Sequence, residues 1–444
     1  MIKDENSLYW IWLSEKCGVA SKEFGVLATR YENPFDLYGL EADEIEHLEG
    51  IGNALKARLG EKSLENAYSI LRYCKQNDVE IISYGDARYP SRLKTIEDPP
   101  VLLYVKGRLP DLNSRLCVGM VGTRKMSEYG RQSAYKISYE LAAANAVVVS
   151  GMALGVDGVA ACGALAAKGS TVAVLGCGIS VIYPKEHEAL WREIVRHGAV
   201  VTEYAPMEKP FGYHFPKRNR LISGLCQGVL VVEGAEGSGA LITAKCAIEQ
   251  GRELFALPGK INESNSDGPN LLIQNGAHVA LAAEDILRHY DFLYHDMINY
   301  RGLRQATLRA TPEETALEKY GVAGLYERKK AAKPKQEKAQ STQTELRAEK
   351  QTDSKKAAKR ERVEAVEASE PKTSVEASPD FDKLLSELDE VSRKIYEAMP
   401  KGRAVSPDGI VVEGVGIGEI ITSLTLLELS GLVSSQAGGL YCRH

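Results

Sequence analysis

Residues 215–224 have the sequence Phe215-Pro216-Lys217-Arg218-Asn219-Arg220-Leu221-Ile222-Ser223-Gly224. Three cations, an amide and an aromatic ring stand within the first six residues, directly before a short apolar segment. We expect these residues to form a basic loop at the mouth of a sheet, where open α/β folds bind their ligands. Arg and Lys suit phosphate groups, and an exposed ring suits a stacked base. The alternative is an ordinary solvated basic loop.

Apolar strand-like segments alternate with helix-like segments on both sides of this stretch. The expected strands are 116–121, 147–149, 171–175 and 199–202 upstream, and 229–232 and 253–257 downstream. Continuous apolar strands of this kind indicate a parallel sheet whose two faces are covered by helices. The predicted fold class is therefore α/β, with a Rossmann-like, doubly wound parallel sheet over residues 79–290.

Nearly every expected strand ends in a glycine turn. Glycine allows a backbone to approach a ligand closely, and the carboxyl ends of parallel strands meet at one edge of a sheet. We therefore expect a single anion-binding rim that also includes the basic stretch. The residues assigned to it from the turns are Gly122, Thr123, Arg124, Gly151, Gly178, Lys185 and Gly237.

The segments on either side of the central domain differ from it in composition. Residues 1–78 indicate short helices, and the turn Gly50-Ile51-Gly52 is typical of a helix-hairpin-helix or SAM-like domain, whose amides can face a phosphate. A tight loop between packed helices needs the same glycines. The composition shifts again around residues 291–378, where residues 328–378 are rich in Lys, Glu, Ala, Gln and Ser; this predicts a charged disordered linker over 291–378 or, alternatively, a solvated single helix.

In residues 379–444, apolar residues again recur at helical spacing, and the segment ends in a glycine-containing hairpin. This pattern predicts a winged helix. The expected second helix of this domain, around residues 420–429, carries no Lys or Arg. A helix that reads the major groove needs side chains that reach base edges and phosphates. We therefore do not expect this domain to read duplex DNA.

The overall composition restricts the class of protein. The 444-residue chain has a net charge of −5, so an anion site must be local. The eight cysteines are scattered without a CxxC pair, which indicates a reducing cytoplasm. The eight histidines form no HExxH motif, and we expect neither a metal nor a cofactor. No apolar run resembles a targeting or membrane segment, so a cytoplasmic protein without a membrane partner is expected.

Two common phosphate-binding motifs are absent from the sequence. No GxxxxGK[ST] motif is present, because Gly239 is followed by Ala240 and Leu241, and this disfavours a P-loop nucleotidase. The turn Gly176-Cys177-Gly178 lacks the third glycine and the acidic residue of a dinucleotide fingerprint. The rim therefore does not correspond to either of these nucleotide sites.

Several motifs of the central domain occur together in one order and spacing. They are Val121-Gly122-Thr123-Arg124, Ser150-Gly151-Met152-Ala153-Leu154-Gly155-Val156-Asp157, Ile182-Tyr183-Pro184-Lys185, residues 215–220, Gly237-Ser238-Gly239-Ala240-Leu241-Ile242-Thr243-Ala244, Ala256-Leu257-Pro258-Gly259 and Asn270-Leu271-Leu272-Ile273. In these motifs, their order and their spacing, the sequence resembles the DprA/Smf (DNA-processing protein A) family over about residues 82–287.

The resemblance implies a non-enzymatic protein that binds single-stranded DNA. It also implies that the protein forms a homodimer, protects incoming DNA and loads RecA recombinase onto it during natural transformation. By motif, Arg124 and the cluster Lys217, Arg218, Asn219 and Arg220 would hold phosphates. Phe215 would stack on a base. Ser238, Gly239 and Thr243 would line the same pocket.

A competing interpretation is an enzyme of the same Rossmann variant. The sequence resembles the nucleoside-monophosphate phosphoribohydrolases, whose signature PGGxGTxxE ends in a catalytic glutamate. Aligned on the turn Gly237-Ser238-Gly239, this chain has Thr243 at the position of that glutamate. Without a carboxylate there, no group stabilises the cationic sugar during cleavage of the glycosidic bond. We therefore favour the binding protein.

Overall fold

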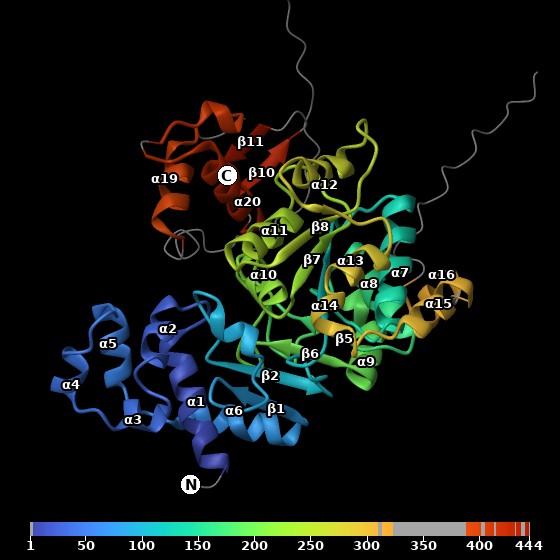
Figure 1. Cartoon of the computed structure of the whole chain (residues 1–444). Coiled ribbons are helices and arrows are strands. Elements are labelled where there is room, and N and C mark those ends of the chain that lie inside the picture. The colour runs from blue at the N-terminus through green and yellow to red at the C-terminus, as the bar shows by residue number, and fades with distance from the viewer. Residues whose placement is uncertain are drawn as a thin grey trace, which may run out of the picture. The chain divides into compact units, whose positions relative to one another are not determined.

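The structure is a computed structural model, and it describes residues 3–309, 313–322, 388–400, 405–412, 414–430, 432–436 and 440–443 (Figure 1). Most of the predicted linker, from residue 323 to residue 378, lies outside the described residues. A search of the described helices finds none with the length and apolar character needed to cross a bilayer.

The N-terminal part is helical. Its helices are α1 (Lys3–Cys17), α2 (Lys22–Ala28), α3 (Pro34–Gly39), α4 (Ala42–Glu46), α5 (Asn53–Gly60) and α6 (Glu65–Gln76). In the turn before α5, Gly50 has a φ of +80° and Gly52 donates its amide to Oε1 of Glu23 at 2.6 Å. The carboxylate of Glu23 thus accepts a hydrogen bond from the Gly52 amide, which in a helix-hairpin-helix would be available to a phosphate.

A nine-stranded sheet forms the centre of the chain, in the order β1-β2-β6-β5-β4-β3-β7-β8-β9. The strands from β6 to β9 along this order pair in parallel, whereas β1 and β2 are antiparallel additions at one edge. The largely parallel sheet confirms the predicted α/β, Rossmann-like fold. The strands are β1 (Val79–Ser83), β2 (Leu102–Gly107), β3 (Cys117–Val121), β4 (Val147–Ser150), β5 (Thr171–Val174), β6 (Ala199–Thr202), β7 (Gly228–Val231), β8 (Glu253–Ala256) and β9 (His278–Val279).

Helices cover both faces of this sheet. The connections α7 (Glu128–Ala143), α8 (Val156–Ala166) and α9 (Glu188–His197) pack on one face, and α10 (His214–Gly224) and α11 (Gly239–Glu249) pack on the other (Figure 1). Along β3, Val118 and Met120 belong to the core under α7 and α8, while Cys117 and Val121 belong to the core under α10 and α11. This alternation follows from the two-residue period of a strand.

The basic stretch differs from the prediction, because α10 begins at His214 and residues 217–220 are helical rather than a loop. Pro216 stands in the first helical turn, where its missing N–H has no intrahelical partner to lose. Leu221 and Ile222 are buried in the core. Lys217 is exposed, whereas the three polar residues that follow it are buried.

Past the sheet, the helices continue beyond residue 290, so the predicted start of the linker is too early. The described elements there are α12 (Ser264–Gln274), α13 (Ala283–His289), α14 (Asp291–Tyr294), α15 (Tyr300–Arg309) and α16 (Glu313–Lys319). Near the C-terminus, α19 (Glu390–Ala398), the 3-10 turn η3 (Pro407–Gly409) and α20 (Ile417–Leu429) precede an antiparallel hairpin of β10 (Val433–Gln436) and β11 (Leu440–Arg443). The winged helix stays a prediction.

Candidate nucleic-acid interface

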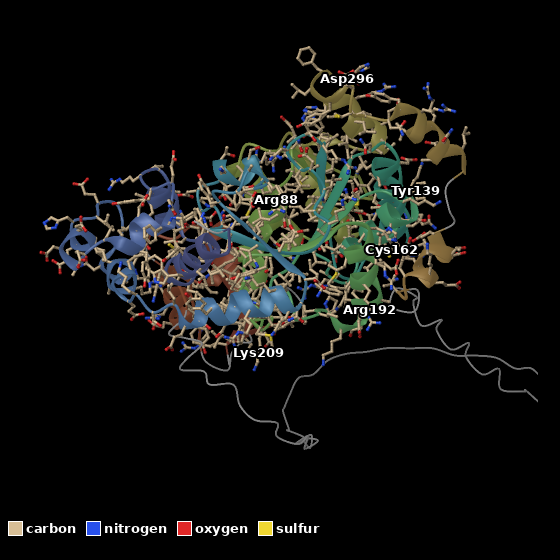
Figure 2. All side chains as sticks on the ribbon, turned by 90° about the horizontal axis from the view of Figure 1, so that it is seen from below. Arg88, Tyr139, Cys162, Arg192, Lys209 and Asp296 are labelled. Atoms are coloured by element: carbon tan, nitrogen blue, oxygen red, sulfur yellow. The ribbon has the colours of Figure 1, made fainter. Side chains whose placement is uncertain are left out.

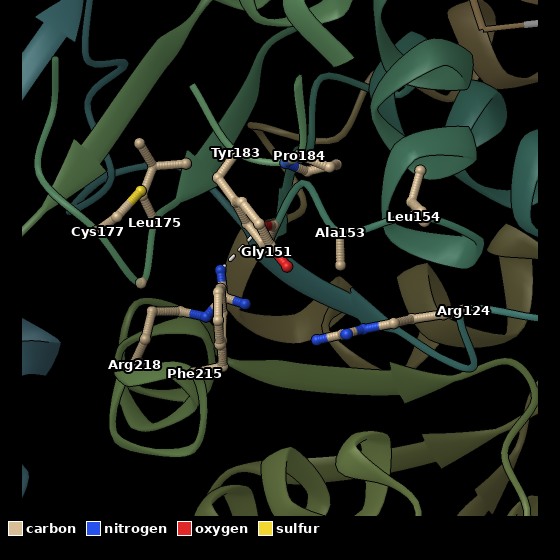
Figure 3. Close-up of a pocket in the computed structure, with 11 residues that line it drawn as sticks. Arg124, Gly151, Ala153, Leu154, Leu175, Cys177, Tyr183, Pro184, Phe215 and Arg218 are labelled. Carbon is tan, nitrogen blue, oxygen red and sulfur yellow. Dashed lines mark hydrogen bonds between the residues drawn. The ribbon is translucent and has the colours of Figure 1, made fainter. Parts of the chain in front are cut away.

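A pocket lies where α10 passes the carboxyl ends of β3, β4 and β5 (Figure 3). Two guanidinium groups and two aromatic rings project into it, and none of its lining residues carries a carboxylate. Such a lining favours an anionic ligand that also presents a planar ring. The lining residues are Arg124, Gly151, Ala153, Leu154, Leu175, Gly176, Cys177, Tyr183, Pro184, Phe215 and Arg218.

The ring of Phe215 lines this pocket. It is half-buried and tilted by 36° against Tyr183, with the ring centroids 5.3 Å apart. The guanidinium carbons of Arg124 and Arg218 lie 5.8 and 5.9 Å from the Phe215 centroid. A Cβ at Gly176 would come within 2.9 Å of the ring, so the glycine lets the turn after β5 approach it. The ring of Phe215 thus lies beside the exposed guanidinium of Arg124 and against the turn after β5.

Arg218 is almost fully buried, with 4% of its surface exposed. Its Nη1 donates to the carbonyl oxygens of Gly151, at 2.9 Å, and Val174, and its Nε donates to Oδ1 of Asn219 at 3.2 Å. Burial lowers the pKa of this guanidinium, and the nearby carboxylate of Asp157 acts in the opposite direction. Arg218 therefore joins α10 to the ends of β4 and β5 and has little surface left for a ligand.

Arg220 is also buried, but it does not line the pocket. Its guanidinium pairs with Glu203 and, at 3.1 Å, with Asp98. The two carboxylates hold the charge inside the protein, so Arg220 is placed to stabilise the fold and not to contact phosphate. This position does not favour the predicted role of Arg220 as a phosphate ligand, which stays a prediction. The pairing with Glu203 agrees with the pattern expected of a structural arginine.

Three of the predicted cations are exposed. Arg124 follows β3 at the pocket, Lys217 lies in the first turns of α10, and Lys185 begins the 3-10 turn η2 (Lys185–His187). The ammonium of Lys217 lies 5.7 Å from the ring centroid of Tyr213. Of these three cations, only Arg124 belongs to the pocket lining.

Exposed arginines elsewhere have a different environment. Figure 2 shows charged side chains of both signs over the surface, among them Arg88 and Arg192. Arg88 pairs with Glu80 and Asp86 at 2.7 and 2.9 Å, and Arg192 pairs with Glu188 at 2.6 Å. A carboxylate thus offsets each of these charges, whereas the pocket lining has none.

The predicted glycine turns at β3 and β5 serve packing rather than the pocket. A Cβ at Gly122 would lie 2.5 Å from Cγ2 of Val156, and one at Gly178 would lie 2.3 Å from the carbonyl oxygen of Ala205. The amide of Thr123 donates to the carbonyl oxygen of Glu233 at 2.7 Å. These three predicted residues therefore shape the strand ends but do not line the pocket.

The predicted residues at the start of α11 lie outside the pocket lining as well. Gly237 has a φ of +77°, and Ser238 is the N-cap residue, although its hydroxyl makes no capping bond. Thr243, the residue at the position of the phosphoribohydrolase glutamate, is buried. Nδ2 of Asn219 donates to the carbonyl oxygen of Gly239 at 3.3 Å, which links α10 to α11. This turn therefore adjoins α10 through Asn219.

Tyr183 is a pocket residue that was not among the predicted site residues. In the Tyr-Pro turn the sequence predicts Lys185 as a site residue, yet it is Tyr183 that faces Phe215, before a cis peptide bond to Pro184. A second aromatic pair lies just before α10, where Phe211 and Tyr213 stack with centroids 5.7 Å apart and planes within 6°. Phe211 and Tyr213 stand directly before the basic stretch in the sequence, and this position is the signal that could have identified them.

The fold and site together define a Rossmann-like protein with an aromatic, cationic pocket at its strand ends. The family model for DNA recombination-mediator protein A matches residues 80–291. DNA processing protein DprA of Bacillus subtilis (strain 168) is 40% identical over 236 residues, which cover 52% of this chain and 80% of that protein. The Streptococcus pneumoniae DprA is 44% identical over 207 residues, or 47% and 73% of the two chains.

A solved structure supports the same relationship. The X-ray structure of DprA from Streptococcus pneumoniae superposes with a TM-score of 0.54 at 36% identity, covering 63% of this chain and 97% of that one. The chain belongs to the DprA/Smf family. The relatives in Bacillus subtilis and Streptococcus pneumoniae are both named DNA processing proteins.

Proposed function

We propose that the pocket between α10 and the ends of β3, β4 and β5 binds single-stranded DNA. The observation that carries this proposal is the position of Phe215 between two guanidinium groups in a lining without carboxylates. Stacking on an aromatic ring stabilises a base whatever its identity, and cations beside it attract the backbone. The pocket therefore suits a strand without sequence preference.

The cations divide into two roles. Arg124, Lys185 and Lys217 are exposed, so they can contact phosphates and release counterions. Arg218 is fixed by the carbonyl oxygens of Gly151 and Val174 and positions Phe215 on the same helix. We thus expect the exposed cations to contribute the affinity for phosphate. Arg218 is expected to maintain the shape of the pocket.

Stacking also predicts a preference for a single strand over a duplex. A base that lies against Phe215 must be unpaired and turned away from its neighbours. In a duplex, that base would first have to leave the stack, at a cost of a few kcal/mol. The same pocket on double-stranded DNA would retain only backbone contacts.

A binding titration tests the proposal. The full chain is titrated with a fluorescent single strand, the matching duplex and a nucleoside monophosphate at several salt concentrations. We expect the single strand to bind most tightly, with log K falling by about 0.7 per log salt for each phosphate neutralised. Equal affinity for single strand and duplex, or an affinity independent of salt, would refute the proposal.

We further propose the cellular role that the family resemblance implies. The chain would protect incoming single strands in the cytoplasm, act as a homodimer and load RecA during natural transformation. Support comes from the family membership and from the DNA-binding pocket proposed above. The test measures RecA filament formation on a coated single strand with and without the chain, and the mass of the chain across a concentration series. No acceleration of filament formation would contradict RecA loading, and a monomeric mass at every concentration would contradict the dimer.

A further inference from the structure

Two histidines and a glutamate converge at the β9 edge of the sheet. Glu253 is the first residue of β8, His278 is the first residue of β9, and His289 is the last residue of α13. Nε2 of His278 and Nε2 of His289 lie 3.1 and 3.7 Å from the same Glu253 oxygen, Oε2. Among the residues that the structure describes, these form one group whose ligand atoms all lie within 4.8 Å of one another.

The backbone explains why the three side chains meet. His278 pairs with Phe255 in the parallel β8–β9 ladder, and Glu253 precedes Phe255 by two residues. Residues two apart on a strand, and partners across a ladder, point to the same face of the sheet. The end of α13 brings His289 to this face, where it meets the ring of Phe255 at 5.5 Å.

Phe255 also holds both imidazoles in place. Its centroid lies 5.3 Å from His278, while the two imidazole centroids are 4.6 Å apart. Phe255 itself is buried. Two imidazoles that share one aromatic support and one carboxylate oxygen are arranged before any ligand arrives, which reduces the entropy lost on binding.

We propose that Glu253, His278 and His289 bind a divalent transition-metal ion, with Zn²⁺ as the ion of choice. Metal–ligand distances near 2.0–2.2 Å in a tetrahedral site place two ligand atoms roughly 3.3 Å apart. The observed 3.1 and 3.7 Å separations lie on either side of that value, so small side-chain rotations suffice. Imidazole nitrogen with one carboxylate suits Zn²⁺, whereas Mg²⁺ and Ca²⁺ prefer all-oxygen sites.

The exposure of the three side chains defines the kind of site. They are 46%, 45% and 32% exposed for Glu253, His278 and His289, so water can complete the coordination. The ion would join β8, β9 and α13, which secures a two-residue edge strand against fraying. An ion that binds the folded chain and not the unfolded chain would also raise the free energy of unfolding. The alternative is a set of surface ion pairs between a carboxylate and protonated histidines.

A metal titration of the full chain, with any polyhistidine tag removed, distinguishes these alternatives. Co²⁺ binding is followed by its visible absorption, and Zn²⁺ affinity by calorimetry. We expect one ion per chain, displacement of Co²⁺ by Zn²⁺ and no displacement by Mg²⁺. His278→Ala and His289→Ala should each weaken Zn²⁺ binding at least about tenfold. Glu253→Gln, which keeps the shape of the side chain, should do the same.

His295→Ala is the matched control. Nδ1 of His295 lies 3.0 Å from Asp291, so it forms a similar histidine–carboxylate pair that lacks the second imidazole. Its Zn²⁺ affinity should equal that of the unmodified chain. The affinities are compared for variants that, without metal, unfold at the same temperature as the unmodified chain. The proposal would be overturned if both His278→Ala and His289→Ala bound Zn²⁺ as tightly as the unmodified chain. An equal loss in His295→Ala would overturn it too.

Discussion

The guanidinium of Arg218 donates a hydrogen bond of 2.9 Å to the carbonyl oxygen of Gly151. This bond joins a helix on one face of the sheet to the turn after β4, and it lies directly beside Phe215. Because the guanidinium of Arg218 is buried, it fixes the position of the pocket residues and has little contact with solvent. In the proposed mode of binding, contacts that position the pocket and contacts with phosphate therefore belong to different cations, and mutation can separate them.

Arg124→Ala tests the phosphate contact. Arg124 is exposed and lines the pocket, so its removal should weaken single-strand binding and reduce the salt slope by about 0.7, the loss of one neutralised phosphate. Thermal unfolding should change little. Arg192→Ala, which removes an exposed arginine on α9 that pairs with Glu188, should leave both affinity and slope unchanged. A salt slope that stays the same in Arg124→Ala would remove this residue from the phosphate site.

Phe215→Ala tests the stacked base. Loss of the ring should weaken single-strand binding by on the order of 1–3 kcal/mol. Stacking releases no counterions, so the salt slope should not change. Fluorescence titrations at four salt concentrations give both quantities.

Phe292→Ala is the control for this variant, since that ring is 95% exposed and lies outside the pocket lining. Its affinity should match that of the unmodified chain. If Phe215→Ala instead lowers the unfolding temperature while each folded molecule binds DNA normally, the ring packs the core and does not contact a base.

Arg220→Met tests the structural arginine. Removing one partner of a buried ion pair leaves Glu203 charged and unpaired, which costs roughly 3–5 kcal/mol of folding stability. Denaturant unfolding should show this loss, and Arg220→Met with Glu203→Gln should recover part of it. DNA affinity per folded molecule should persist, because Arg220 does not line the pocket. Normal stability combined with lost binding would restore Arg220 to the phosphate site.

The sequence predicted the sheet better than it predicted the site. Short, continuous apolar runs such as 147–149 and 171–175 are typical of central strands that are buried on both faces. Their alternation with helical segments indicates the fold class. The two-residue strand β9 has exposed side chains and no apolar pattern, so no such signal marked it. The apolar run 101–105 predicts the strand β2, but its antiparallel pairing with β1 and β6 depends on tertiary contacts.

The helix α10 shows why the basic stretch was only partly predictable. Its composition correctly indicated a local cluster of charge, but composition does not state which cations face solvent. That choice depends on where the helix begins, and a first-turn Pro216 is compatible with both a loop and a helix start. The burial of Arg218 and Arg220 follows from partners, such as Gly151 and Glu203, that are distant in sequence.

The last prediction concerns acid stability and His214, the first residue of α10. His214 is buried, and its ring lies 4.1 Å from that of Tyr204. Burial, with a smaller contribution from Lys217, lowers the pKa of His214 from 6.5 to about 4. The unfolded chain therefore binds the proton between these values and the folded chain does not, so stability is present above pH 6.5 and is lost as pH falls toward 4. Between pH 7.5 and pH 5 this residue should account for a loss on the order of 1–2 kcal/mol.

His214→Gln should reduce that loss when denaturant unfolding is compared at the two pH values. Part of the decline should remain, because burial also lowers the pKa of His187. His197→Gln changes an exposed histidine on α9 and serves as the control, for which the decline should equal that of the unmodified chain. If His214→Gln loses as much stability between pH 7.5 and pH 5 as the unmodified chain, His214 is not a residue that must remain neutral for α10 to stay in place.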